Sequence, residues 1–111
     1  MILVTFQTNV GVIDDLKIAS SKLFTDKNEF EETCLRFFNN RLNHQYSSFA
    51  ELYGSHEDFE FHYMAGENNH YEYYEKISDF IDKFTIREIT DAEAQIVQKF
   101  FGTEFGDFPI W

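Results

Sequence analysis

Fourteen phenylalanines and six tyrosines in a chain of 111 residues require a fold that removes most of these rings from water. One proline and five glycines are too few for a disordered or low-complexity chain, and hydrophobic residues make up 43% of the sequence. The length is that of one ordinary domain. We therefore expect a single compact domain over residues 1–111, with a core built mainly of aromatic side chains.

The charge of the chain restricts its partners. Twenty Asp and Glu against nine Lys and Arg give a net charge of -11 at pH 7. Phosphate backbones and anionic lipids repel such a surface, so we expect neither direct nucleic-acid binding nor membrane binding. The acidic excess lies mainly in the second half, and residues 42–75 contain no Lys or Arg.

Two features indicate the cellular compartment. Cys34 is the only cysteine, so the chain cannot form an internal disulfide, as is usual in a reducing environment. The first ten residues, MILVTFQTNV, lack the basic leader and the long apolar run of a signal peptide. No later apolar run approaches membrane-spanning length. We expect a cytoplasmic protein.

The first quarter of the chain gives one clear element and one ambiguous one. Residues 2–8 are β-branched and aromatic and predict a strand. Residues 12–24, VIDDLKIASSKLF, fit either a returning strand or a short helix, and their periodicity does not decide. We favour a helix near 13–20.

Residues 27–43 predict an amphipathic helix. Asp26 followed by Glu29 has the spacing of a capping box. The apolar residues after it recur at helical spacing: Phe30, Cys34, Phe37, Phe38 and Leu42. Ser48 and Glu51 repeat the capping spacing, so a short helix at 48–53 should follow, with Gly54 at its end.

Residues 56–84 combine acidic and aromatic side chains. Phe59, Phe61 and Tyr63 alternate with polar residues, which predicts a half-buried strand, and residues 65–69 read as a loop. We expect a second long helix from about Asn69 to Phe84, with an apolar stripe of Tyr73, Ile77, Phe80 and Phe84 widened by Tyr74 and Ile81. Its opposite face would carry an acidic ridge of Glu72, Glu75, Asp79 and Asp82.

The last quarter repeats the pattern on a smaller scale. Residues 85–89 alternate like a short strand, and Thr90 with Glu93 begins a helix that Gly102 ends. The aromatic tail, which contains Pro109, predicts an edge strand or an extended arm. The whole pattern predicts an α+β fold, with a small, mainly antiparallel sheet packed against three or four amphipathic helices.

Catalytic signatures are weak. Asp58, Glu60 and His62 should share one strand face, where they could hold a metal or form an acid–base pair, but a solvated polar face explains the spacing better. Cys34 lies on an apolar helix stripe, where thiols are usually inert. The sequence contains no nucleophile elbow, no phosphate-binding glycine loop and no paired zinc ligands. We expect no enzyme and no cofactor.

The acidic and aromatic block indicates a cationic protein partner. Carboxylates steer a basic protein into encounter, and tyrosines supply contact area. Basic clefts are a property of proteins that bind nucleic acid, so the expected partner is a nuclease or another nucleic-acid-binding protein. The candidate contact residues are Asp58, Glu60, Glu67, Glu72, Glu75, Asp79, Asp82, Tyr63, Tyr71 and Tyr73, and Trp111 is either a core residue or an anchor.

This partner suggests an immunity protein that neutralises a nuclease toxin. One alternative is a phage-type nucleic-acid mimic that inhibits a host defence nuclease, as anti-CRISPR and anti-restriction proteins do. A second is a small metal- or ligand-binding domain or an enzyme, for which the surroundings of His62 are the place to look. A bland alternative also exists, because acidic runs are often only a solvated surface.

Overall fold

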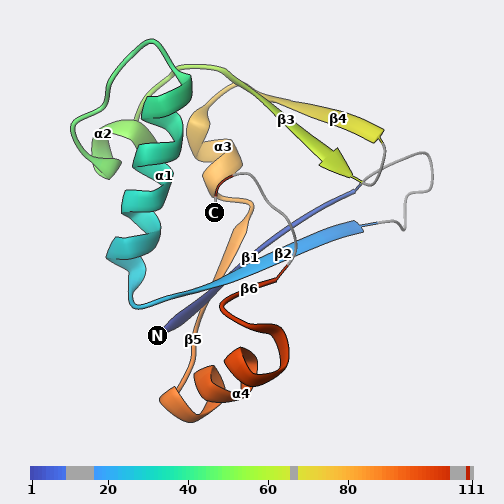
Figure 1. Cartoon of the computed structure of the whole chain (residues 1–111). Coiled ribbons are helices and arrows are strands. Elements are labelled where there is room, and N and C mark those ends of the chain that lie inside the picture. The colour runs from blue at the N-terminus through green and yellow to red at the C-terminus, as the bar shows by residue number, and fades with distance from the viewer. Residues whose placement is uncertain (10–16, 66–67, 106–109, 111) are drawn as a thin grey trace.

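The computed structural model describes residues 1–9, 17–65, 68–105 and 110 and confirms a small α+β fold (Figure 1). Within these residues there are four helices and two antiparallel sheets. The larger sheet has the strand order β5-β1-β2-β6. Its strands are β1 (Ile2–Asn9), β2 (Lys17–Phe24), β5 (Phe84–Glu88) and β6 (Glu104–Phe105). The smaller sheet is a pair of β3 (Phe59–Ala65) and β4 (Asn68–Tyr74).

Side-chain caps fix the starts of three helices as predicted. Asp26 accepts a hydrogen bond from the Glu29 N–H at 2.9 Å before α1 (Lys27–Arg41). Ser48 accepts one from the Glu51 N–H before α2 (Phe49–Tyr53), which Gly54 ends. A full capping box of Thr90 and Glu93 begins α4 (Asp91–Phe101), and Gly102 ends it at a φ of 75°. Each cap satisfies an amide that would otherwise lack a partner at the helix start.

The larger sheet separates two layers of helices. Ile2, Val4 and Phe6 of β1 are buried on the face that α1 covers. Since side chains alternate along a strand, Leu3 lies on the opposite face. There it shares a small apolar pocket with Val97 and Phe101 of α4. The helix α4 therefore packs on the face of the sheet away from α1.

The core is built of aromatic rings, as predicted. Phe80 of α3 (Ile77–Ile81) lies at its centre, with its ring centroid 4.8 Å from that of Phe61 and 5.5 Å from that of Phe6. The ring centroid of Phe38 of α1 lies 4.7 Å from that of Phe59. These contacts join both sheets and α1 into one apolar cluster.

The helix favoured near 13–20 is wrong for the described part of that range. Residues 17–24 form β2, which pairs antiparallel with β1 in the register Ile2 to Phe24, while residues 10–16 lie outside the described residues. The apolar residues of 12–24 have no decisive periodicity. Pairing with the hydrogen-bonding edge of β1 therefore decides that residues 17–24 form a strand and not a helix.

The long helix predicted over 69–84 is also wrong. Residues 68–74 form β4, and only Ile77–Ile81 are helical, as α3. Tyr71, Tyr73 and their neighbours fit a period of two as well as a helical period, and β3 offers them a partner strand. Of the predicted loop at 65–69, Ala65, Asn68 and Asn69 belong to strands, whereas residues 66 and 67 lie outside the described part.

Glu104–Phe105 of the tail form an edge strand, β6, which is one of the two structures predicted for the tail. β6 pairs with β2, where Lys22 contacts Glu104 at 3.1 Å. Ile110 is buried in the core cluster, whereas Pro109 and Trp111 lie outside the described residues. The predicted strand at 85–89 is confirmed as β5, one residue earlier.

Candidate functional site

The first half of the candidate site lies on β3. Phe59 and Phe61 are buried, whereas Asp58, Glu60 and His62 are exposed. The predicted alternation is therefore confirmed for residues 58–62. It places the two acidic residues and the imidazole on one outward face, with the rings of the strand locked in the core beneath them.

The second half comes from β4, which the sequence assigned to a helix. Tyr73 lies directly opposite Glu60 in the ladder, and Tyr71 lies opposite His62. Both tyrosines therefore share the outward face of β3, and they are 55% and 69% exposed. We call Asp58, Glu60, His62, Tyr71 and Tyr73 the acidic tyrosine face.

Contacts within the acidic tyrosine face hold its side chains in place. The Tyr73 hydroxyl donates to Asp58 Oδ2 at 3.0 Å. The rings of His62 and Tyr71 stack with centroids 5.8 Å apart, and His62 Nε2 lies 3.5 Å from Glu60 Oε2. The ring of Tyr71 is stacked on His62, and the ring of Tyr73 is held by its hydrogen bond to Asp58. Rings held in this way lose little conformational entropy when a partner binds.

The electrostatic potential of this face is negative. The hydrogen bond to Asp58 raises the pKa of Tyr73 above its usual value, and the nearby charges of Glu75 and Glu60 raise it further. Glu75, which follows β4, therefore lies close enough to Tyr73 to act on the same face. Glu75 therefore lies near Asp58 and Glu60, as predicted. The hairpin of β3 and β4 brings them together, whereas the prediction placed Glu75 on a helix.

The other predicted acidic residues are not brought to this face. Glu72 is on the inward side of β4, where the Tyr74 hydroxyl donates to it and Lys83 approaches at 3.5 Å. Asp82 accepts a hydrogen bond from the Tyr53 hydroxyl at 2.7 Å, and Asp79 is exposed on α3. The predicted helical ridge of Glu72, Glu75, Asp79 and Asp82 is wrong, since no helix spans these residues. Glu67 and the side chain of Tyr63 lie outside the described part.

Two observations on the described part of the chain concern the metal site and the nucleophile that the sequence raises as alternatives. Among these residues, no group of three His, Cys, Asp or Glu side chains is arranged to hold a metal ion. Burial, with a smaller effect from Glu31, raises the pKa of the Cys34 thiol to about 12. Cys34 is therefore a protonated core residue at neutral pH and a poor nucleophile.

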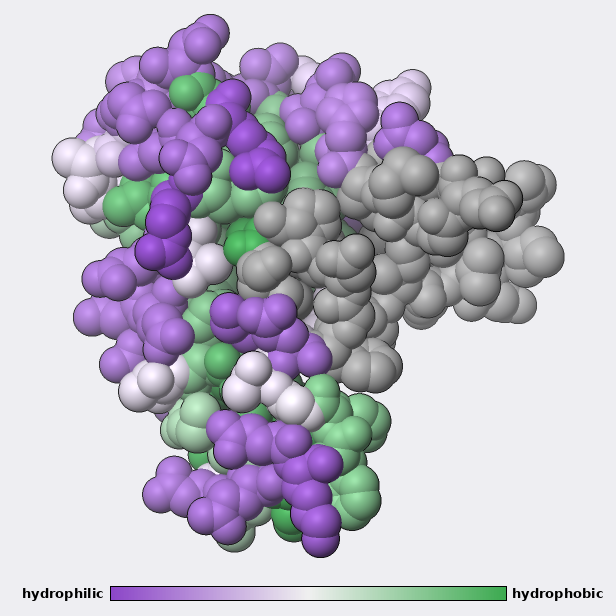
Figure 2. Space-filling view, viewed as in Figure 1, coloured by the Kyte–Doolittle hydropathy of each residue, from purple (hydrophilic) through white to green (hydrophobic). Residues whose placement is uncertain are grey.

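Two apolar surfaces were not anticipated. On α4, Ile96 and Phe100 are 58% and 68% exposed, and Figure 2 shows hydrophobic surface over this end of the molecule. Between α1, α2, α3 and β5 there is a groove of about 400 Å³ whose lining includes Phe30 and Ile86. The α4 residues were visible in the sequence as helix markers, but nothing in their spacing indicated that they would stay exposed.

No family model, curated protein or solved structure matches this chain. In the residues that the structure describes, no helix is both long and apolar enough to cross a membrane. Among the described surfaces, the acidic tyrosine face has the most defined chemistry.

Proposed function

We propose that this protein is a non-enzymatic inhibitor that binds a basic nucleic-acid-handling protein, and that it is an immunity protein against a nuclease toxin. The observation that carries the proposal is the acidic tyrosine face. It presents two exposed tyrosines among carboxylates, on a segment, residues 42–75, that contains no Lys or Arg. A solvated surface without a partner would be expected to interleave both signs of charge and to carry few exposed rings.

The chemistry of this face fits a cationic partner. Tyr71 and Tyr73 supply rigid contact area, and tyrosine is among the residues that dominate binding energy at protein interfaces. Asp58, Glu60 and Glu75 surround Tyr73 with negative charge. Opposite charges accelerate encounter, and arginines of the partner can pair with carboxylates or stack on the rings.

The shape of the site favours a discrete interface over nucleic-acid mimicry. A mimic needs carboxylates repeated over a length comparable with several phosphates. The described face has only Asp58 and Glu60 in a row along β3, since the helical ridge does not form. The immunity reading therefore fits this surface better than the phage-type mimic does.

The test is capture of partners from the native cell lysate at low and high salt, followed by mass spectrometry. The variant Asp58→Lys/Glu60→Lys reverses charge on the acidic tyrosine face. The matched control, Asp79→Lys/Asp91→Lys, makes the same change of net charge at two exposed helix positions elsewhere. We expect a basic nuclease that binds the wild type and the control but associates about 10-fold more slowly, or not at all, with the first variant.

Three results would speak against the proposal. Equal loss of binding in both variants would mean attraction by net charge alone. Capture of a partner that is neither basic nor a nucleic-acid enzyme would contradict its stated class. If the captured nuclease is displaced by any DNA added in competition, with no toxin encoded near the gene, then mimicry is the better description.

A further inference from the structure

Among the described residues, the outer edge of β5 has no further strand beside it, and this edge lies next to the apolar groove. β5 is at one end of the strand order and has β1 as its neighbour on one side. The groove is lined by residues of α1, α2, α3 and β5: Lys27, Phe30, Glu31, Phe49, Tyr53, Ile81, Asp82, Phe84 and Ile86. A strand edge that has no neighbouring strand is a template for a further strand, so this arrangement needs a physical explanation.

The hydrogen-bond pattern shows which residues of β5 direct their backbone outward. The Ile89 N–H donates to the Met1 carbonyl at 3.1 Å, and these residues are opposite each other in the ladder that pairs Ile2 with Glu88. Hydrogen-bonded pairs alternate along an antiparallel ladder. Thr85 and Arg87 therefore bond to β1, whereas Phe84, Ile86 and Glu88 point their N–H and C=O groups away from it.

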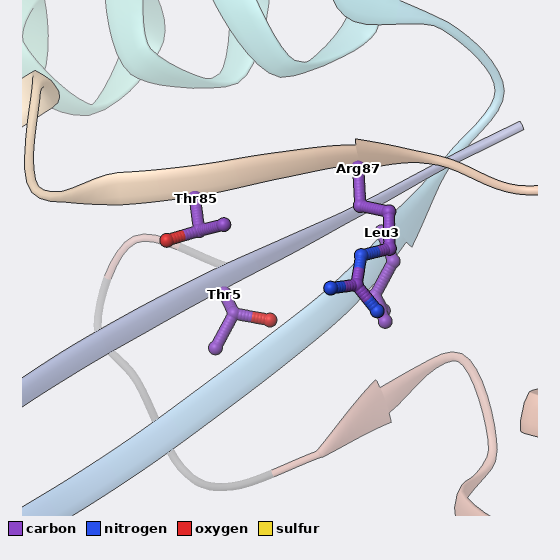
Figure 3. Close-up of a pocket in the computed structure, with 4 residues that line it drawn as sticks. All are labelled: Leu3, Thr5, Thr85 and Arg87. Carbon is purple, nitrogen blue, oxygen red and sulfur yellow. The ribbon is translucent and has the colours of Figure 1, made fainter.

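Two of these residues, Phe84 and Ile86, direct their side chains toward the groove. Phe84 and Ile86 line it, and Ile86 is 41% exposed although it lies on the face of the sheet that forms the core. Thr85 and Arg87 point to the other face, where Figure 3 shows them with Leu3 and Thr5 around a separate hollow. Outward backbone groups and a partly exposed apolar side chain therefore meet at Ile86.

We infer that the β5 edge binds an extended segment of a partner protein by adding it to the sheet as an antiparallel strand. Main-chain hydrogen bonds to Ile86 and Glu88 would give affinity, and the groove would take alternate side chains of the segment. This is a second interaction surface, because the acidic tyrosine face belongs to the other sheet.

The charges around the groove specify the segment. Among the groove residues, Glu31 and Asp82 are acidic and Lys27 is basic. Glu88, which is exposed at the end of β5 outside the groove, adds a third carboxylate along this edge. The segment should therefore place an apolar residue opposite Ile86. The residues two positions before and two positions after it, whose side chains point to the same face, should be basic. On the other face, beside Thr85 and Arg87, it should carry neutral polar residues. The pattern Lys-Thr-Ile-Thr-Lys meets these conditions.

The experiment uses a fluorescein-labelled peptide, Ser-Lys-Thr-Ile-Thr-Lys-Ser, titrated with the full protein and followed by fluorescence anisotropy. Two N-methylated peptides separate strand addition from attraction of a cation to an acidic protein. Methylation of the Ile nitrogen blocks a hydrogen bond to β5 and should weaken binding about tenfold. Methylation of the following Thr nitrogen, which points away from β5, should change it little.

Variants of Glu88 test the protein side. Glu88→Pro removes an outward N–H, which an edge strand tolerates, and Glu88→Gln removes the same charge but keeps the N–H. We expect binding to be weaker with Glu88→Pro than with Glu88→Gln, and unchanged with Arg87→Ala on the other face. Circular dichroism of each variant checks that the fold is intact.

Hydrogen exchange then locates the peptide. Bound peptide should slow the exchange of the Ile86 and Glu88 amides, and Tyr71→Ala should leave this protection unchanged. Equal binding of the two N-methylated peptides, or protection that falls on residues 59–74 instead, would overturn the inference. The first result would leave the acidic tyrosine face unaffected, whereas the second would mean that the basic peptide binds the acidic tyrosine face instead of β5. The lysate capture tests the function proposed for that face separately.

Discussion

Residues 27–43 and 69–84 have similar apolar spacing but fold differently. The first stretch forms α1 over 15 residues, whereas the second divides into the strand β4 and a helix of five residues, α3. Asp26 caps α1, but Lys76 makes no side-chain cap at the start of α3. Apolar spacing therefore identifies a helix only where the ends of the stretch and its neighbours in the fold also favour one.

The decisive neighbour of the second stretch is β3. Tyrosine fits a pleated surface well, and Tyr71 and Tyr73 alternate with Glu72 and Tyr74. Pairing with β3 buries Tyr74 beside Phe59 and leaves the two alternate tyrosines exposed. A helix would have buried Tyr73 and exposed the hydrogen-bonding edge of β3. The tertiary pairing thus creates the acidic tyrosine face.

The largest expected effect on the free energy of unfolding comes from removing a core ring of the first stretch. Phe38 of α1 is fully buried, with its ring against those of Phe37, Phe59 and Phe80. Phe38→Ala should lower the free energy of unfolding by about 3–5 kcal/mol, because it leaves a cavity among rings that cannot close around it. Urea denaturation measures this loss.

The control for that prediction comes from the second stretch. Tyr71→Ala removes an exposed ring from β4 and should lower the free energy of unfolding by less than about 1 kcal/mol. If both variants lost the same stability, Tyr71 would belong to the core and the acidic tyrosine face would not be a surface available to a partner.

The sequence predicts those elements whose signals are local, and it misses those that depend on pairing with distant strands. α1, α2 and α4 begin at side-chain caps, and α2 and α4 end at glycines. These signals are local, since each acts within a few residues of the helix end. β2 and β4 depend on pairing with other strands, which no local pattern contains. The depth of burial on α4 also depends on what packs against it, so the exposure of Phe100 could not be predicted from its helical spacing.

The candidate site shows the same division. The sequence places Asp58 and Glu60 correctly, because their exposure follows from the alternation of their own strand. It associates Tyr71 and Tyr73 with them by proximity along the chain, but assigns these tyrosines to the wrong element. It places Asp79 and Asp82 on one face of a long helix, and that helix does not form. The groove at β5 joins four elements, and only the folded chain brings them together.

Cys34 provides a pH-dependent test of the packing around α1. Its thiol has a pKa of about 12 in the folded protein, above the usual 9.0, because burial disfavours the thiolate. The neutral thiol therefore stabilises the fold fully below pH 9.0, and this contribution is lost as the pH rises toward 12. At about pH 10.5 the free energy of unfolding should be lower by about 2 kcal/mol on this account.

Other groups also titrate in this range, so the measurement compares the wild type with Cys34→Ala in urea at about pH 8 and about pH 10.5. The variant is less stable at both values but should lose less stability between them. The same loss in both proteins would mean that the thiol ionises in the folded state, and that α1 is packed more loosely around Cys34 than the structure indicates.

The smallest expected effects concern the caps. Asp26→Ala removes the hydrogen bond to the Glu29 amide and should lower the free energy of unfolding by about 1 kcal/mol. Lys76→Ser adds a capping side chain before α3, which begins without one, and should raise it by about 0.5 kcal/mol. Lys76→Ala is the control for the lost positive charge. If Lys76→Ser is no more stable than Lys76→Ala, the missing cap does not limit the stability of α3. The pairing of β3 with β4 alone would then explain why this stretch does not form a long helix.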